Sequence, residues 1–212
     1  MSKIILFQGD SITDCGRSRE NDANKGVGYP LLVTSELGYE QPEQYTFYNR
    51  GISGNRIVDV YARIKMDIIN LKPDYMSILI GINDVWHEIA YQNGVASDKF
   101  EKIYDMLLTE IKEELPDIKL ILLAPFVLNG SATCDCEEVP DRWDRFVAGA
   151  KLNAEAVRRL AEKHGAAFVE LQSKFDALDA AHPGIWTGDG VHPTPAGHQI
   201  IKREWLNAFR ML

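Results

Sequence analysis

The sequence predicts an α/β fold in three layers, with a central parallel sheet of about five strands between two layers of helices. Short apolar runs recur along the chain, at 4–7, 45–48, 76–80, 120–123 and 167–171. Longer amphipathic stretches separate them, which is typical of parallel strands joined by right-handed helical crossovers. Several runs are continuously apolar, as expected for strands covered on both faces. We therefore expect one domain that spans residues 1–212.

Helix signals follow the strands in order. After the third strand, apolar residues at helical spacing predict a helix over 100–111, which Pro116 ends. After the fourth strand, the same spacing predicts a helix over 146–161, with Gly165 just past its end as the C-cap. A last helix follows the fifth strand. It begins with Thr194 as N-cap and Pro195 in its first turn.

Composition excludes several classes of function. The formal net charge of −8 argues against a nucleic-acid or an anionic-membrane partner, because both require a basic surface. No apolar run approaches transmembrane length, and the start of the chain does not resemble a secretory leader. The 3 cysteines are an odd number, so no complete disulfide framework is implied. We expect a cytoplasmic protein.

Four short polar motifs lie where the chain leaves a strand or enters the last helix. They are GDSIT at 9–13, GISGN at 51–55, GIND at 81–84 and DGVHP at 189–193. In parallel α/β sheets, sites form at the carboxyl ends of the strands. We therefore expect the four motifs to meet in one site.

Together the motifs supply the groups needed for acyl transfer. Ser11 is the candidate nucleophile, and His192 is the candidate base that later protonates the leaving alcohol. Asp189, three residues before His192, can hold the histidine ring. The Ser11 N–H, the Gly54 N–H and the Asn83 side-chain amide are candidate donors to an oxyanion.

Other features carry weaker signals. Trp86 and Trp186 flank the third and fourth motifs, so we expect both at the rim of the site, as sugar-binding or as packing residues. The pair Cys134 and Cys136 lacks partners at metal-binding spacing and predicts a solvated loop. No metal site and no cofactor-binding motif is predicted.

The four motifs, in this order, resemble the blocks of the SGNH (GDSL-type) hydrolase family, whose name corresponds here to Ser11, Gly54, Asn83 and His192. The resemblance implies a flavodoxin-like fold and a Ser–His–Asp triad that works without metal or cofactor. The longer stretches around the motifs are similar to intracellular acetyl xylan esterases of this family. That similarity implies the removal of O-acetyl groups from small carbohydrates such as xylo-oligosaccharides. It also makes a homo-oligomer plausible.

Two other hypotheses remain open from the sequence. The same scaffold hosts lysophospholipases and thioesterases, whose substrates carry longer acyl chains, and fold alone does not choose among them. A non-catalytic flavodoxin-like binding protein would need no triad. The sequence does not identify the residues that line an acyl pocket.

Overall fold

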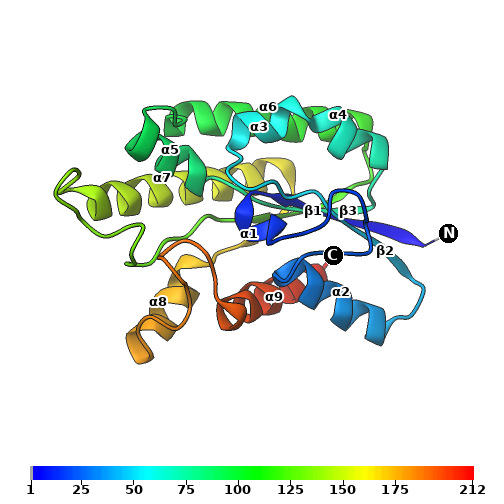
Figure 1. Cartoon of the computed structure of the whole chain (residues 1–212). Helices are drawn as coiled ribbons and strands as arrows, with labels where there is room; N and C mark the ends of the chain where they lie inside the picture. Colours follow the sequence, from blue (N-terminus) through cyan, green and yellow to red (C-terminus); the bar gives the residue numbers. More distant parts are fainter. Residues whose placement is uncertain (1) are drawn as a thin grey trace.

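A computed structural model describes residues 2–212 and contains a five-stranded parallel sheet in the order β2-β1-β3-β4-β5 (Figure 1). The strands are β1 (Lys3–Gly9), β2 (Tyr45–Asn49), β3 (Tyr75–Leu79), β4 (Lys119–Leu123) and β5 (Ala167–Val169). All the apolar runs predicted as strands form strands, and the α/β prediction is confirmed. The fifth strand ends two residues earlier than predicted, because the chain turns into the next helix after Leu171.

Helices cover both faces of this sheet (Figure 1). One face carries α2 (Tyr29–Glu40), α8 (Gln172–Ala181) and α9 (Pro195–Phe209). The other carries α3 (Ile57–Ala62), α4 (Ile64–Asp67), the short 3-10 helix Ile69–Leu71, α6 (Ser97–Glu114) and the second half of α7 (Arg142–His164). The predicted helices correspond to α6, α7 and α9. Gly165 caps α7 in the left-handed conformation, and Thr194 caps α9 through its side chain.

The alternation of side chains along β1 explains why the strands are apolar throughout. Ile5 and Phe7 point to the face covered by α2 and α9, whereas Leu6 points to the face covered by α3 and α6. All three side chains are fully buried. A strand buried on both faces has no solvent side on which a polar residue would be favourable.

The sheet order places a topological switch point at β1. The chain passes from β1 to β2 on one side and then returns to β3 on the other. In open α/β sheets, the crevice at the carboxyl ends of the two strands beside such a point is the preferred ligand site. The short helix α1 (Ser11–Asp14) follows β1 at this edge, and α5 (Ile82–Tyr91) follows β3. The GDSIT and GIND motifs therefore begin at the crevice.

Among the helices of residues 2–212, none combines the length and apolar character needed to cross a bilayer.

Candidate active site

Ser11, His192 and Asp189 form a hydrogen-bonded chain. Ser11 Oγ lies 2.9 Å from His192 Nε2, and His192 Nδ1 lies 2.7 Å from Asp189 Oδ2. An ionised carboxylate can only accept, so Nδ1 carries the ring proton and donates it to Asp189. Nε2 then holds a lone pair and accepts the hydroxyl hydrogen of Ser11. This is the tautomer that a general base requires.

The environment of Asp189 favours its charged form. Burial opposes ionisation, but the backbone N–H and ring Nδ1–H of His192 and the N–H of Val191 all donate to the carboxylate. The hydrogen bonds outweigh burial and hold the pKa of Asp189 below its ordinary value. Asp189 therefore stays ionised and can stabilise a proton taken up by His192.

The turn that carries Asp189 and His192 is fixed against the segment that follows β4. Leu128 N–H donates to Gly190 O at 2.8 Å, and Ala132 N–H donates to Asp189 O at 2.9 Å. Gly190 has a φ of +101°, and a Cβ there would lie 2.5 Å from Leu128 O. Only glycine fits this position. The glycine of the DGVHP motif thus allows the close backbone contact that holds the triad loop.

The candidate oxyanion donors lie at the neighbouring strand ends. Asn83, in the first turn of α5, is buried and donates from Nδ2 to Asn55 O at 3.1 Å, which places its amide beside the Asn55–Arg56 peptide. Ile52 N–H donates to Gly9 O at 3.0 Å and joins that loop to the turn before Ser11. The amide of Asn83 has two N–H groups, and one remains for a substrate oxygen.

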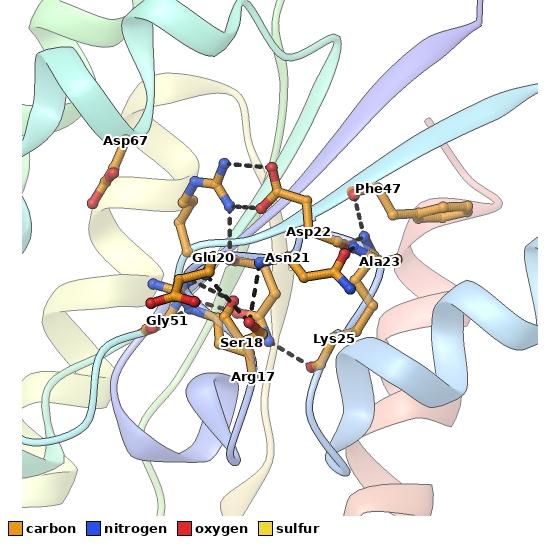
Figure 2. Close-up of polar contacts among 12 residues, drawn as sticks. Arg17, Ser18, Glu20, Asn21, Asp22, Ala23, Lys25, Phe47, Gly51 and Asp67 are labelled. Carbon is orange, nitrogen blue, oxygen red and sulfur yellow. Dashed lines mark hydrogen bonds and ion pairs between the residues drawn. The ribbon is translucent and has the colours of Figure 1, made fainter.

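Strand β2 and the loop between β2 and α3 are also held by an N-terminal segment, residues 17–25 (Figure 2). Arg17 Nε donates to Gly51 O at 2.7 Å, and Lys25 Nζ donates to Phe47 O at 2.6 Å. Arg50 forms a bidentate ion pair with Asp22. The backbone that presents Gly54 is therefore braced by side chains rather than free in solvent.

The two tryptophans differ in their surroundings. The ring centroid of Trp86 lies 5.9 Å from that of His192, at the edge of the triad. Trp186, like Trp86, is partly buried and packs against the apolar core, and its buried Nε1 has no hydrogen-bond partner among residues 2–212. The structure thus brings Trp86 to the site, whereas the contacts of Trp186 favour the packing alternative.

Two buried carboxyls near the site were not recognised as buried from the sequence. Asp10 accepts the Ile12 N–H at 3.0 Å, and burial raises its pKa to about 7 despite that bond. Asp84 accepts the Ile57 N–H with both oxygens, and burial likewise raises its pKa to about 7. Both carboxyls order backbone at the strand ends: Asp10 caps α1, and Asp84 caps α3.

His198, which no sequence motif selects, lies buried beside the turn that carries Ser11. Its Nδ1 accepts the Tyr29 N–H at 3.1 Å, so its Nε2–H faces Cys15 Sγ at 3.4 Å. Burial, with a smaller contribution from the charge of His192, lowers the pKa of His198 to about 4. This histidine is therefore neutral at neutral pH and serves as a structural link.

We expect His198 to make the fold sensitive to acid. In the unfolded chain its pKa is near 6.5, so between about 6.5 and about 4 the unfolded state binds a proton that the folded state excludes. The free energy of unfolding should therefore decrease as the pH is lowered through this range, by up to about 1.4 kcal/mol per pH unit from this group. Urea unfolding of wild type and His198→Gln at several pH values measures the effect. Equal pH slopes for the two proteins would contradict it.

The described residues contain no cluster of side chains suited to bind a metal ion. Residues 2–212 contain no group of three or more His, Cys, Asp or Glu side chains placed to hold an ion. The cysteines are free, and Cys136 Sγ accepts a hydrogen bond from Arg142 Nη2 at 2.8 Å. The loop with Cys134 and Cys136 thus lies beside the start of α7, and Cys136 contacts that helix through Arg142.

Comparisons with known proteins agree on one family. The model of the GDSL-like Lipase/Acylhydrolase family matches residues 7–200. The chain is 36% identical to an acetylxylan esterase of Geobacillus stearothermophilus over 213 residues, covering 95% of this chain and 91% of that protein.

Solved structures extend the similarity to three dimensions. A GDSL-like lipase from Parabacteroides merdae superposes with a TM-score of 0.90 and 34% identity, over 100% of this chain and 98% of that one. A catalytic serine-to-alanine mutant of an acetylxylan esterase from G. stearothermophilus superposes with a TM-score of 0.79 and 33% identity, over 98% and 95% of the two chains.

Proposed function

The chain belongs to the GDSL-like lipase/acylhydrolase family, and from this premise we propose that it removes acetyl groups from small carbohydrates through Ser11, His192 and Asp189. The family and the esterase relative make the protein a serine carboxylic-ester hydrolase. The observation that carries the assignment of residues is the chain from Ser11 Oγ through the His192 ring to Asp189, with distances of 2.9 and 2.7 Å. A non-catalytic binding protein would not need this arrangement.

The first half of the reaction transfers the acetyl group to the enzyme. His192 Nε2 takes the hydroxyl proton of Ser11 while Oγ attacks the ester carbonyl carbon, and Asp189 stabilises the positively charged ring. The carbonyl oxygen becomes negative and accepts hydrogen bonds from the Asn83 amide and the N–H groups of Ser11 and Gly54. When the intermediate collapses, Nε2 returns the proton to the leaving alcohol oxygen, and the acetyl group remains on Ser11.

The second half restores the enzyme. A water molecule gives a proton to His192 Nε2 and attacks the acetyl carbonyl, and the same donors hold the negative oxygen. Collapse breaks the bond to Ser11 Oγ, which regains its proton from His192, and acetate leaves. Besides the substrate and water, these steps use the three triad side chains, the Asn83 amide and the backbone N–H groups of Ser11 and Gly54.

The sugar acetate is proposed by analogy with the acetylxylan esterase relative. Short acetylated xylo-oligosaccharides inside the cytoplasm are the substrates that fit this proposal best. The free cysteines of the described chain agree with a reducing compartment.

Acyl-chain preference separates this proposal from a hydrolase of longer acyl chains. We expect kcat/KM for p-nitrophenyl esters to be highest for acetate and to fall as the chain lengthens, and we expect release of acetate from acetylated xylo-oligosaccharides. A groove for long chains would instead gain about 0.8 kcal/mol for each buried CH₂. An increase of kcat/KM from acetate to palmitate would therefore move the assignment to lipid or thioester substrates.

A further inference from the structure

A groove opens beside the triad, between α5, α7 and the loop that joins β4 to α7. We call it the Trp86 groove. It has a volume of about 390 Å³ and is lined mainly by Trp86, Ile89, Glu138, Val139, Arg142 and Phe146. This volume lies in the range of small-molecule sites. None of the four motifs identified in the sequence lines it.

The groove adjoins the triad at Trp86. The Trp86 ring lies between the His192 ring, at 5.9 Å, and the Phe146 ring, which it meets edge-on at 5.9 Å. The loop on the far wall is joined to the triad turn by the hydrogen bond from Ala132 N–H to Asp189 O. Trp86 is thus shared by the triad and the groove.

The proposed reaction sets the direction in which the substrate extends. The oxyanion must face the Asn83 amide and Gly54, whereas the leaving oxygen must face His192 Nε2 to receive its proton. The alcohol part of the ester therefore leaves the reaction centre on the His192 side. That side is bounded by Trp86 and continues into the groove.

The lining combines an aromatic face with two polar groups. Arg142 donates to Cys136 Sγ but forms no ion pair with any carboxylate of residues 2–212, so guanidinium N–H groups remain for a ligand. The Glu138 side chain is exposed and can accept hydroxyl hydrogens. Aromatic faces and a few polar groups suit a ring whose faces carry C–H groups and whose edge carries hydroxyls.

We propose that the Trp86 groove binds the sugar units of the leaving alcohol. Trp86 lies against a pyranose face, and Arg142 and Glu138 hydrogen-bond to ring hydroxyls. This inference rests on the proposed function and specifies the part of the site that would distinguish a sugar ester from a simple acetate.

The test compares two acetyl esters in each variant. Arg142→Met and Glu138→Gln are each assayed with p-nitrophenyl acetate and with acetylated xylobiose. Loss of a hydrogen bond to a charged group should lower the ratio of kcat/KM for the sugar ester to that for p-nitrophenyl acetate on the order of tenfold. Xylobiose should inhibit p-nitrophenyl acetate hydrolysis by wild type, and more weakly in both variants. Arg158→Met is the matched control. Arg158 lies on the same helix, but its guanidinium stacks over the Phe168 ring, so the ratio of kcat/KM for the two esters should not change.

Each outcome has a distinct meaning. An unchanged ratio in both folded variants, with or without an equal loss of kcat/KM for both esters, would overturn the groove assignment. If Arg142→Met does not fold, the exposed Glu138→Gln variant still decides. A wild type that hydrolyses p-nitrophenyl acetate but no acetylated sugar would overturn the proposed substrate itself, and the groove assignment with it.

A different observation concerns Arg63, which lies between α3 and α4 with its side chain almost buried. It donates from Nε to Asn55 Oδ1 at 2.9 Å and from Nη1 to Arg50 O at 2.8 Å. It also donates from Nη2 to Gln8 Oε1 at 2.7 Å and from Nη1 to Asp67 Oδ2 at 2.8 Å. One guanidinium therefore links β1, the loop after β2 and α4.

Arg63 reaches the candidate oxyanion donors through Asn55. The Asn55 carbonyl accepts the hydrogen bond from Asn83 Nδ2 that fixes the orientation of that amide. Its side chain is in turn held by Arg63. We infer that Arg63 is a positioning residue, which holds Asn55 so that Asn83 presents its second N–H to the oxyanion.

A double-mutant cycle tests this role. Arg63→Lys keeps the charge but removes the planar guanidinium and its several N–H donors. It should lower kcat for p-nitrophenyl acetate on the order of 10- to 100-fold, with KM within about twofold of wild type. Asn83→Ala should lower kcat by about 10²–10³. Because Arg63 acts through Asn83, the double variant should be no slower than Asn83→Ala. Asp67→Asn, which alters the same guanidinium without touching Asn55, is the control and should retain kcat.

Additive losses in the double variant would overturn the positioning role, as would a loss in Asp67→Asn equal to that in Arg63→Lys. An Asn83→Ala variant with wild-type kcat would instead remove Asn83 from the proposed mechanism. The cycle thus separates a failure of this inference from a failure of the proposed oxyanion donors.

Discussion

Ser11→Ala is expected to lower kcat for p-nitrophenyl acetate by about 10⁴- to 10⁶-fold, because the substitution removes the atom that forms the acetyl-enzyme. The fold should persist, since the Ser11 hydroxyl contacts only the ring of His192 among the described side-chain hydrogen bonds. Steady-state kinetics, with circular dichroism as a check of the fold, measure the loss.

Ser35→Ala provides the matched control for that variant. Ser35 lies in α2, where its exposed hydroxyl donates to Leu31 O at 2.8 Å. Its removal should leave kcat unchanged. A Ser11→Ala protein that keeps more than a tenth of wild-type kcat would show that another group is the nucleophile.

Asp189→Asn is expected to lower kcat on the order of 10⁴-fold through the tautomer of His192. The asparagine oxygen can still accept the N–H groups of Val191 and His192, so the turn should keep its shape. The new amide would face Nδ1 with a donor, and Nδ1 would then carry the lone pair. Nε2 would hold the proton and could not accept that of Ser11.

Kinetics on p-nitrophenyl acetate test this expectation, with Asp98→Asn as control. Asp98 lies in the first turn of α6, and within residues 2–212 it forms an ion pair only with the exposed Lys102. Activity of Asp189→Asn within tenfold of wild type would assign Asp189 a purely structural role.

The contact among Ser11, His192 and Asp189, the proposed triad, was predictable because each residue sits in a short motif at a strand end or before the last helix. A parallel sheet brings such ends to one edge, so the sequence alone places Ser11 and Asn83 at the same edge. The pairing of Asp189 with His192 followed from their separation of three residues. Local sequence and sheet topology were sufficient for this part of the site.

The hydrogen bonds that hold the site residues in place were not predictable, because they join segments that are distant in the sequence. Arg63 joins Gln8 to Asn55, and His198 joins Cys15 to Tyr29. No spacing in the sequence signals such contacts. The Trp86 groove likewise arises only when α5, α7 and the loop between β4 and α7 pack together.

Burial explains the remaining differences. Asp10 and Asp84 are polar residues of turn motifs, which normally lie at the surface, yet both are almost fully buried. Trp186 packs against the core, which favours the packing alternative that the sequence left open. The sequence identifies residues that can lie at a strand end, but the layers of helices decide which of them water reaches.

The most direct test of the central claim is the mass of the enzyme during turnover of p-nitrophenyl acetate. Rapid acid quenching followed by peptide mass spectrometry should find one acetyl group on the peptide that contains Ser11, and none in Ser11→Ala. Acetylation of a different residue, or turnover by wild type with no acetyl group on Ser11 at any time, would contradict a mechanism in which Ser11, His192 and Asp189 form and hydrolyse an acetyl-enzyme.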